Sequence, residues 1–461
     1  MRGIIKLAAL VILGGLLARA DATEQRPNFL LLFTDDQRFD TIHALGCREI
    51  LTPHMDALAK DGVSFTHAAI MGSMQGAVCI PSRAMLMTGR GLARLQKDGA
   101  VIPSDHVMMS EWLHQNGYRT FITGKWHQDK ASLRRGFQQG EAIFVGGMGD
   151  HFNMPVCDLA DGQLVNNRVE TRFDAEVLAD AAIKFLQTQK TGTPFFAYVS
   201  FRTPHDPRVG PKHFHDIYDA SKLPLPPNFQ PEHPFDIGIR KLRDELLAPY
   251  PRTPEEIRQH IAAYYALTTA TDTQMGRILA ALRQSGLADN TVVIFAGDNG
   301  MAVGQHGLMG KQSLYDHSIR VPLIITGPGL PKDKRTDAFC YLLDIFPTVC
   351  AMAGLRPPSS CTDGRNLLPL LKGQQENVRE TLFFAYSHLM RAVRTRDWKL
   401  IEYDINGQTH TQLFHLTHDP WETNNLATDP QHANILQKLQ TELASWAKDN
   451  IPVERPGKKG T

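Results

Sequence analysis

The stretch Cys79-Ile80-Pro81-Ser82-Arg83, continued by Ala84-Met85-Leu86-Met87-Thr88-Gly89-Arg90, is the part of the sequence around which the rest of the chain is organised. Pro81 suits the first turn of a helix and good helix formers follow it, so Cys79 is predicted to lie at a helix N-terminus. Unpaired backbone N–H groups at that end of a helix attract anions. This environment, with Arg83 nearby, is expected to lower the pKa of the Cys79 thiol.

The combination of Cys79 to Arg83 with Thr88-Gly89-Arg90 resembles the signature of the type I sulfatases, a family in the alkaline-phosphatase superfamily. The resemblance runs from about Pro27 to the region of Asp419 and Pro420. It implies an α/β fold with a large mixed, mostly parallel sheet flanked by helices. A small C-terminal α+β subdomain built on an antiparallel sheet is expected to follow.

In the sulfatase family, a maturation enzyme oxidises the signature cysteine to formylglycine (3-oxoalanine), whose hydrated aldehyde is the nucleophile. The resemblance therefore implies that Cys79 is the modified residue and does not act in its encoded form. It implies that residue 79 attacks sulfur and forms a covalent sulfate ester, while Arg83 holds the modified side chain and screens its charge.

Length and composition limit the classes of protein that need considering. The chain has 461 residues, with 42% hydrophobic and 21% charged residues, which is typical of a globular soluble protein. Its formal net charge of +1 gives no support for nucleic-acid binding through a basic surface. We expect a signal peptide over residues 1–22, a catalytic domain over 23–370 and a C-terminal subdomain over 371–461.

The N-terminus has the pattern of a secretory signal. A basic start is followed by an apolar run from Leu7 to Leu17 and by alternating small residues, which predicts cleavage after Ala20 or Ala22. The run is too short to span a membrane. We therefore expect an exported protein, periplasmic or secreted, with no membrane attachment in its mature form.

Four polar motifs follow apolar stretches of strand length. In chain order they are Asp35-Asp36 after Asn28–Phe33, Gly124-Lys125-Trp126-His127 after Tyr118–Thr123, His205 after Phe195–Phe201, and Asp298-Asn299 after Thr291–Ala296. Each motif alone has an ordinary structural explanation, such as a solvated Asp turn or a half-buried histidine. Because ligands bind at the carboxyl ends of strands in open α/β sheets, the shared placement predicts one site.

Hard oxygen donors in these motifs indicate a metal site. Asp35, Asp36, Asp298 and Asn299 suit Ca²⁺ better than Zn²⁺, for which His or Cys ligands are expected. The resemblance implies one Ca²⁺ per chain, held by these four residues and by residue 79.

Cationic and histidine side chains complete the expected site. Lys125 and His127 alternate across Trp126, so they share a face in an extended segment. By resemblance, Lys125 and Lys311 grip the sulfate oxygens, His205 protonates the leaving oxygen, and His127 assists loss of the remaining hydroxyl proton.

The sequence also predicts the structure or the contacts of several segments outside these motifs. The proline-rich stretch 212–254 is predicted to be an irregular surface excursion, and the loop Gly72–Val78 is predicted to contact substrate. Short strands are expected over 381–416, with Asn406-Gly407 as a hairpin turn, followed by a terminal helix over 431–449. One disulfide among Cys340, Cys350 and Cys361 is compatible with the spacing, which does not decide the partners.

The expected function is hydrolysis of sulfate esters of a sulfated carbohydrate. The pattern is similar to iduronate-2-sulfatase-like bacterial enzymes, which suggests a 2-O-sulfated uronic acid. Two alternatives remain: a phosphonate or phosphate monoester hydrolase of the same superfamily, and an inactive sulfated-glycan-binding protein. The sequence leaves open the substrate, the sulfate position, exo or endo action and the oligomeric state.

Overall fold

The computed structural model describes residues 26–451, so the predicted signal peptide lies outside the described part of the chain. Its central strand is β1 (Asn28–Thr34), which is buried along its whole length. Strand β1 pairs in parallel with β10 (Thr291–Gly297) and with β9 (Phe195–Ser200). In turn, β9 pairs in parallel with β5 (Arg119–Lys125). The four apolar stretches singled out in the sequence are thus adjacent strands whose carboxyl ends share one edge.

These strands form the middle of a ten-stranded sheet with the order β12-β2-β11-β10-β1-β9-β5-β6-β7-β8. The remaining strands are β2 (Val63–Phe65), β6 (Gln139–Phe144), β7 (Met154–Ala160), β8 (Gln163–Glu170), β11 (Leu323–Thr326) and β12 (Lys334–Thr336). Strands β7, β8 and β11 run antiparallel to their neighbours in the sheet. The predicted fold class, a large mixed and mostly parallel sheet flanked by helices, is confirmed.

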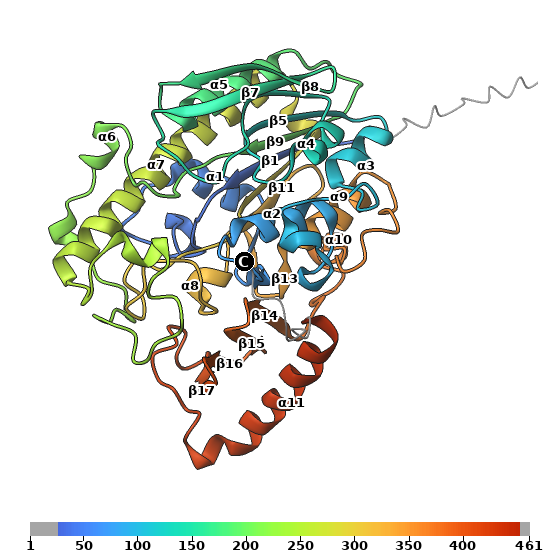
Figure 1. The fold of residues 1–461 in the computed structure, drawn as a ribbon. Coiled ribbons are helices and arrows are strands. Elements are labelled where there is room, and N and C mark those ends of the chain that lie inside the picture. Colours follow the sequence, from blue (N-terminus) through green and yellow to red (C-terminus); the bar gives the residue numbers. More distant parts are fainter. Residues whose placement is uncertain (1–25, 452–461) are drawn as a thin grey trace, which may run out of the picture.

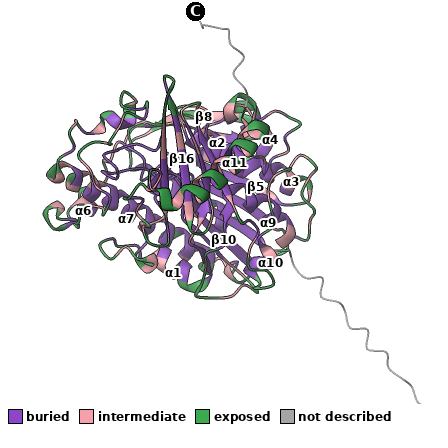
Figure 2. Cartoon of the chain, turned by 90° about the horizontal axis from the view of Figure 1, so that it is seen from below, coloured by how far each residue is buried: buried purple, intermediate pink, exposed green. Residues whose placement is uncertain are grey.

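Alternate residues of β1 enter two different cores, as the period of a strand requires. Phe29, Leu31 and Phe33 pack in one core with the first group of helices, and Leu30 and Leu32 pack in the other core with the second group. The first group is α2 (Cys79–Thr88), α3 (Met109–Gln115) and α9 (Ile345–Met352); the second is α1 (Pro53–Asp61), α5 (Asp174–Gln187) and α7 (Pro254–Gln284). The sheet is accordingly purple between its helical layers in Figure 2.

Helix α2 begins at Cys79, as predicted, and its first residue is 2% exposed. It ends at Gly89, whose φ of 65° is left-handed and whose N–H donates to the carbonyl of Met85. All residues of α2 except Ile80 are buried. The helix therefore holds Cys79 inside the protein rather than at an exposed turn.

The C-terminal region forms the predicted antiparallel sheet of β14 (Leu382–Tyr386), β15 (Met390–Arg394), β16 (Trp398–Ile405) and β17 (Gln408–His415). Asn406 and Gly407 have positive φ and form the hairpin turn between β16 and β17. Helix α11 (Ala433–Asn450), red in Figure 1, lies beside this sheet. Its Leu439 and Leu443 are buried in a cluster with Val393, Leu400 and Leu413 of the sheet. A two-residue strand, β4 (Gly72–Ser73), adds to β14 in parallel, so the loop before Cys79 is hydrogen-bonded to the C-terminal sheet.

Short elements complete the fold: α4 (Lys130–Gly136), α6 (Lys212–His215), α8 (Asp316–Ile319), α10 (Leu368–Leu371) and the pair β3 (Ala68–Ala69) and β13 (Cys340–Tyr341). Apart from α6 and brief 3₁₀ turns, the segment 212–254 is irregular, as expected from its prolines. All six cysteines lie within the described residues, and each is an unpaired thiol, including Cys340, Cys350 and Cys361.

Candidate active site

The Cys79 side chain lies where α2 meets the carboxyl edge of the large sheet. The Cys79 Sγ is 3.5 Å from Lys125 Nζ and 3.2 Å from His127 Nδ1. Lys125 is the last residue of β5; Cys79 and Lys125 are buried, and His127 is half-buried. The predicted nucleophile position, one cation and one histidine are thus brought together.

The geometry of His127 differs from the expectation of an extended segment. Its φ is 69°, in the left-handed region, because the chain turns sharply after the strand. A Cβ atom at residue 147 would lie 2.4 Å from His127 Nε2, so Gly147 leaves the space that the imidazole occupies. Lys125 and His127 converge on Cys79 through this turn rather than through strand alternation.

The four oxygen-donor residues converge as predicted. The backbone N–H of Asp36 donates to Asp298 Oδ1 at 2.9 Å, and Asn299 Nδ2 donates to Asp36 Oδ1 at 2.7 Å. Asp36 has a φ of 64°, which turns its carboxylate toward the neighbouring β10 loop. Ligand atoms of Asp35, Cys79 and Asp298 lie within 4.8 Å of one another.

Lys311 and His205 contact the same carboxylate. Lys311 Nζ lies 2.7 and 2.9 Å from the two oxygens of Asp36, and His205 Nε2 lies 3.5 Å from Asp36 Oδ2. His205 Nδ1 is 2.7 Å from the carbonyl oxygen of Asp206, which fits a neutral ring that donates through Nδ1. The Gly-rich segment before Lys311 therefore delivers its ammonium group into the site.

Arg83 is buried beneath the site and binds the strands together. Its Nε donates to Asp298 Oδ2 at 3.0 Å, and its Nη1 donates to the Lys125 carbonyl at 3.1 Å, Tyr198 Oη at 3.2 Å and Ser200 Oγ at 2.5 Å. No hydrogen bond joins this guanidinium to Cys79 within the described residues. The contacts observed for Arg83 are with the acids and with β5, β9 and β10.

Burial and charge shift the pKa values of the three acids in different directions. Burial acts to raise the pKa of Asp35, but Lys125 and Arg83 outweigh it and hold that pKa well below its usual value. Burial, opposed by Lys311, raises the pKa of Asp36, and burial with the charge of Asp35 raises that of Asp298 to about 7. The raised pKa values of Asp36 and Asp298 indicate that the neighbouring cations do not fully offset the burial of these two carboxylates.

The histidines are held in their neutral form. Burial and the charge of Lys125 lower the pKa of His127 to about 2, and burial with Lys311 lowers that of His205 to about 3. For Cys79, the expected lowering is wrong: burial raises the pKa of its thiol despite Lys125 and Lys311. Desolvation of the thiolate exceeds the help given by the helix N-terminus and the cations.

The donor set fits a hard divalent cation. Asp35 Oδ1 and Asn299 Oδ1 are buried oxygens without a hydrogen-bond partner, and both belong to the predicted ligand set. Carboxylate and amide oxygens are typical Ca²⁺ ligands. Asp35, Asp36, Asp298 and Asn299 could hold such an ion, and the cation would supply positive charge beside Asp36 and Asp298, whose pKa values are raised.

Sequence reasoning missed the residues that hold Arg83 and the loop around Lys311. Tyr198 and Ser200 alternate on β9, so they point to the same side, and this spacing was a usable signal. Gln312 Nε2 donates to Asp244 Oδ2 at 2.7 Å and to the Gly76 carbonyl at 3.1 Å. These contacts join distant loops, and no local pattern reveals them.

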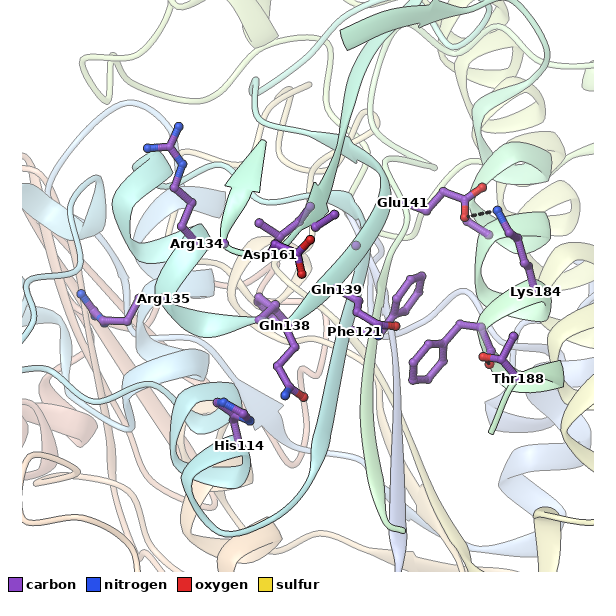
Figure 3. Close-up of a pocket in the computed structure, with 17 residues that line it drawn as sticks. His114, Phe121, Arg134, Arg135, Gln138, Gln139, Glu141, Asp161, Lys184 and Thr188 are labelled. Atoms are coloured by element: carbon purple, nitrogen blue, oxygen red, sulfur yellow. Dashed lines mark hydrogen bonds and ion pairs between the residues drawn. The ribbon is translucent and has the colours of Figure 1, made fainter. Parts of the chain in front are cut away.

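A separate surface pocket of about 710 Å³ lies beside β5 and β6 (Figure 3). Its lining includes Phe121 and Gln139, near the beginnings of these strands, and an ion pair of 2.8 Å between Lys184 and Glu141. None of the predicted site residues lines it. It lies toward the opposite ends of the strands from the acid cluster.

Comparison with protein families identifies the chain. Residues 27–355 match the model described as Sulfatase, and residues 304–449 match the model described as N-sulphoglucosamine sulphohydrolase, C-terminal. The chain belongs to the sulfatase family. This membership assigns it to the sulfuric ester hydrolases, and the predicted family resemblance is confirmed.

Comparisons with individual relatives of this sulfatase agree with the family assignment. It is 30% identical over 443 residues to the Ulvan-active sulfatase of Formosa agariphila, covering 91% of this chain and 80% of the relative. It is 26% identical over 552 residues to human Iduronate 2-sulfatase, covering 95% and 97%. A solved structure in complex with its substrate D-glucosamine-2-N,6-O-disulfate has the same fold, with a TM-score of 0.76, 23% identity and coverage of 93% and 99%.

Proposed function

We propose that this sulfatase removes sulfate from sulfated carbohydrates, through an aldehyde made from Cys79 and with a bound Ca²⁺. The observation that carries the proposal is the position of Cys79 Sγ, 3.5 Å from Lys125 Nζ and 3.2 Å from His127 Nδ1, beside the acid cluster. When present, the hydrated aldehyde supplies a hydroxyl nucleophile for sulfur, and Ca²⁺ supplies positive charge next to the sulfate oxygens.

The residues of the chain supply the remaining requirements. Lys125 and Lys311 are buried ammonium groups on two sides of the acids, where they stabilise negative charge on a sulfate group. His127 is neutral and adjacent to residue 79, so it accepts a proton from a hydroxyl carried there. Arg83 fixes Asp298 and the ends of β5 and β9, which keeps these groups in position.

His205 is the proposed donor of a proton to the leaving oxygen. In the structure it is neutral, with its Nε2 facing Asp36 and its Nδ1 bound to the Asp206 carbonyl. An anionic substrate beside the ring would raise the pKa of His205, because it favours the protonated form. The proton then passes from Nε2 to the alkoxide as its bond to sulfur breaks.

For the substrate, we propose a 2-O-sulfated uronic acid within a polysaccharide or its oligosaccharides. The support comes from the relatives, whose names include an ulvan-active sulfatase and an iduronate 2-sulfatase. We further propose export to the periplasm or the medium, with a maturation enzyme that converts Cys79 as a partner. The signal-like N-terminal sequence supports export.

The deciding experiment measures sulfate release from a 2-O-sulfated uronic-acid disaccharide. The protein is first checked by mass spectrometry for the aldehyde in the Cys79 peptide, and Cys79→Ala serves as the matched control. Release by the aldehyde form alone supports the proposal. Full release by Cys79→Ala would refute the nucleophile, and no release from the verified aldehyde form would refute the uronate substrate. Phosphonate and phosphate monoesters in the same assay test the alternative hydrolase.

A second measurement concerns the metal. Removal of Ca²⁺ by a chelator is expected to lower the melting temperature and to abolish sulfate release, with both restored by added Ca²⁺. Asp35→Asn should lose the Ca²⁺-dependent shift, because it removes a carboxylate whose Oδ1 has no other partner. An unchanged shift in that variant would contradict the assignment of Asp35 as a ligand.

A further inference from the structure

Arg208 follows the His205 turn and is held close to the candidate site. The segment leaves β9, and His205 Nε2 lies 3.5 Å from Asp36 Oδ2, so the turn is fixed against the acid cluster. Three residues later, the Arg208 guanidinium lies with its Cζ 5.8 Å from the centre of the Tyr264 ring. Tyr264 Oη in turn donates to the Asp36 carbonyl at 2.6 Å.

The polar partners of this guanidinium are neutral. Arg208 NH1 donates to His260 Nδ1 at 2.9 Å, and NH2 lies 3.6 Å from Met301 Sδ. Burial and the charge of Arg208 lower the pKa of His260 to about 4, so this histidine is uncharged at neutral pH. The Nε of Arg208 is buried and has no hydrogen-bond partner.

Three arginines that are buried more deeply than Arg208 have a carboxylate in contact. Arg83 binds Asp298, Arg202 lies 3.3 Å from Asp174, and Arg252 lies 2.8 Å from Glu245. Within the described residues, no Asp or Glu oxygen lies within 4 Å of the Arg208 guanidinium. The Arg208 side chain is partly exposed while its Nε is buried, so its guanidinium keeps only part of its hydration. A partly desolvated guanidinium of this kind is suited to an anion that arrives with a ligand.

The placement of Arg208 connects this unmatched charge to the substrate. Met301 follows the predicted ligand Asn299 by two residues, and Tyr264 contacts the backbone of Asp36, so both neighbours of the guanidinium border the acid cluster. Burial lowers the pKa of Arg208. The effect of burial is larger than the opposing effect of the nearby acids Asp206, Asp36 and Asp244. None of these acids is close enough to neutralise the group by contact.

We infer that Arg208 binds a second anionic group of the substrate, a carboxylate or a further sulfate, on the sugar that carries the sulfate to be removed or on its neighbour. A planar guanidinium matches both oxyanions through paired hydrogen bonds. Arg208 is therefore a specificity residue that distinguishes doubly anionic sugars from sugars with a single sulfate. This inference rests on the proposed function and adds the charge of the substrate to it.

The test compares wild type, Arg208→Gln and Arg208→Lys, each verified for the aldehyde. The substrates are a 2-O-sulfated uronate disaccharide, a disulfated glucosamine, a neutral monosulfated sugar and an aryl sulfate without a second charge. Arg208→Gln is expected to lose about 10- to 100-fold in kcat/KM on the first or second substrate, mainly through KM. Its activity on the last two should change by less than about threefold. The substrate that loses activity identifies the anion as carboxylate or sulfate.

Arg240→Gln is the control, because Arg240 is an arginine of the irregular segment 212–254 that is exposed and paired with Glu232 at 3.1 Å. Arg208→Lys should recover part of the loss, since it restores the charge without the paired hydrogen bonds. An equal loss on all four substrates would show a structural role for Arg208, and no loss on any of them would equally overturn the inference.

Failure of the proposed function is separable from failure of this inference. The same sugars are titrated by calorimetry into Cys79→Ala protein, which cannot be converted to the aldehyde form and needs no turnover. If wild type hydrolyses none of the substrates but Arg208→Gln weakens binding of a doubly anionic sugar by about tenfold or more, the inference stands and the proposed reaction fails. Binding that is independent of Arg208 overturns the inference whatever the turnover.

Discussion

At the scale of residues, the candidate site balances charges that could not be buried separately. It contains three carboxylates and three cationic side chains: Asp35, Asp36 and Asp298, with Arg83, Lys125 and Lys311. If all six are ionised, the cluster is neutral. A divalent cation would leave a net charge of +2, which favours an anionic substrate over a neutral one.

His205→Ala is predicted to affect substrates according to their leaving groups. A sugar leaves as a strongly basic alkoxide and requires a proton, whereas an aryl oxide leaves without one. We expect kcat to fall by about 10²- to 10⁴-fold on a sulfated sugar and much less on an aryl sulfate. Steady-state kinetics on both substrates measures the ratio. Equal losses would contradict the role of His205 as a proton donor.

The convergence of the candidate site residues could be predicted from sequence, but their individual contacts could not. Adjacent acids after an apolar strand predict convergence at the sheet edge, and Asp35 and Asp298 do converge there. The same reasoning gave the wrong direction for the Cys79 pKa, since local sequence reveals the helix terminus but not how deeply it is buried. No sequence motif singled out Arg208, because its distinguishing feature is that no carboxylate contacts its guanidinium within the described residues, which only the folded structure reveals.

At the scale of elements, the close pairing of β5 and β9 depends on Gly124. Its φ is 89°, and a Cβ atom at this position would lie 1.9 Å from the carbonyl oxygen of Ser200. The register between β5 and β6 also shifts between Ile122 and Gly124. The irregularity places Lys125 at the end of the strand, facing Asp35 and Cys79.

Gly124→Ala is therefore predicted to be strongly destabilising. Gly162→Ala is its control, because Gly162 has a similar φ of 71° but no atom within 4 Å of the added Cβ. The control should lose about 1–2 kcal/mol from backbone strain alone. Gly124→Ala adds a backbone clash, so its melting temperature or soluble yield should fall much further. Similar melting temperatures for the two variants would contradict the steric explanation.

Asp272 of α7 fixes the beginning of α1. It accepts hydrogen bonds from the backbone N–H groups of His54 at 3.1 Å and Met55 at 2.7 Å, whereas Thr52 provides no side-chain cap. Burial raises the pKa of Asp272 to about 7, well above that of an aspartate in the unfolded chain. The folded protein therefore binds more protons than the unfolded chain between about pH 4 and pH 7.

It follows that the contribution of Asp272 to stability decreases as pH rises through that window, by up to about 4 kcal/mol in all. Asp272→Asn keeps an accepting oxygen but cannot ionise. We expect its melting temperature relative to wild type to increase from pH 5 to pH 8. Glu255→Gln, an exposed carboxyl on the same helix, is the control. A pH-independent difference between Asp272→Asn and wild type would contradict the shifted pKa.

Strands could be predicted from sequence where burial imposes a hydrophobic pattern on their residues. Strands β1, β9 and β10 read as nearly continuous apolar runs because helices cover both faces of the sheet. The segment that forms β6, β7 and β8 carried no prediction, and β8 is mostly solvent-accessible along its length. Two-residue strands such as β4 depend entirely on distant partners, so sequence patterns do not reveal them.

At the scale of the whole molecule, the C-terminal sheet is joined to the site-bearing part by buried charges. Lys399 is fully buried and lies 3.0 Å from Asp316 and 2.6 Å from Glu422. Arg394 lies 3.0 Å from the same Asp316, whose backbone N–H donates to Glu422 at 2.8 Å. Removing either the cations of the C-terminal sheet or the Asp316 carboxylate that they contact would leave unpaired charge in the buried interior.

A chain that ends at residue 370 is accordingly predicted not to fold to a soluble monomer. It lacks the partner of β4 and two of the three cations that contact Asp316, and it exposes the core under β14. Size-exclusion chromatography and circular dichroism of the truncated and full-length proteins measure the outcome. A monomeric truncated chain with a cooperative thermal transition would show that the larger part folds independently.

The pairing of β4 with β14 also determines when, during synthesis of the chain, the loop before Cys79 can acquire its strand partner. Ser73 pairs with Tyr386, about 310 residues later, a length that takes roughly 15 to 60 seconds to synthesise at 5–20 residues per second. Until Tyr386 has emerged, the loop that leads into Cys79 lacks its strand partner. The order of synthesis thus leaves an interval in which a thiol that is 2% exposed in the finished protein is still open to another enzyme.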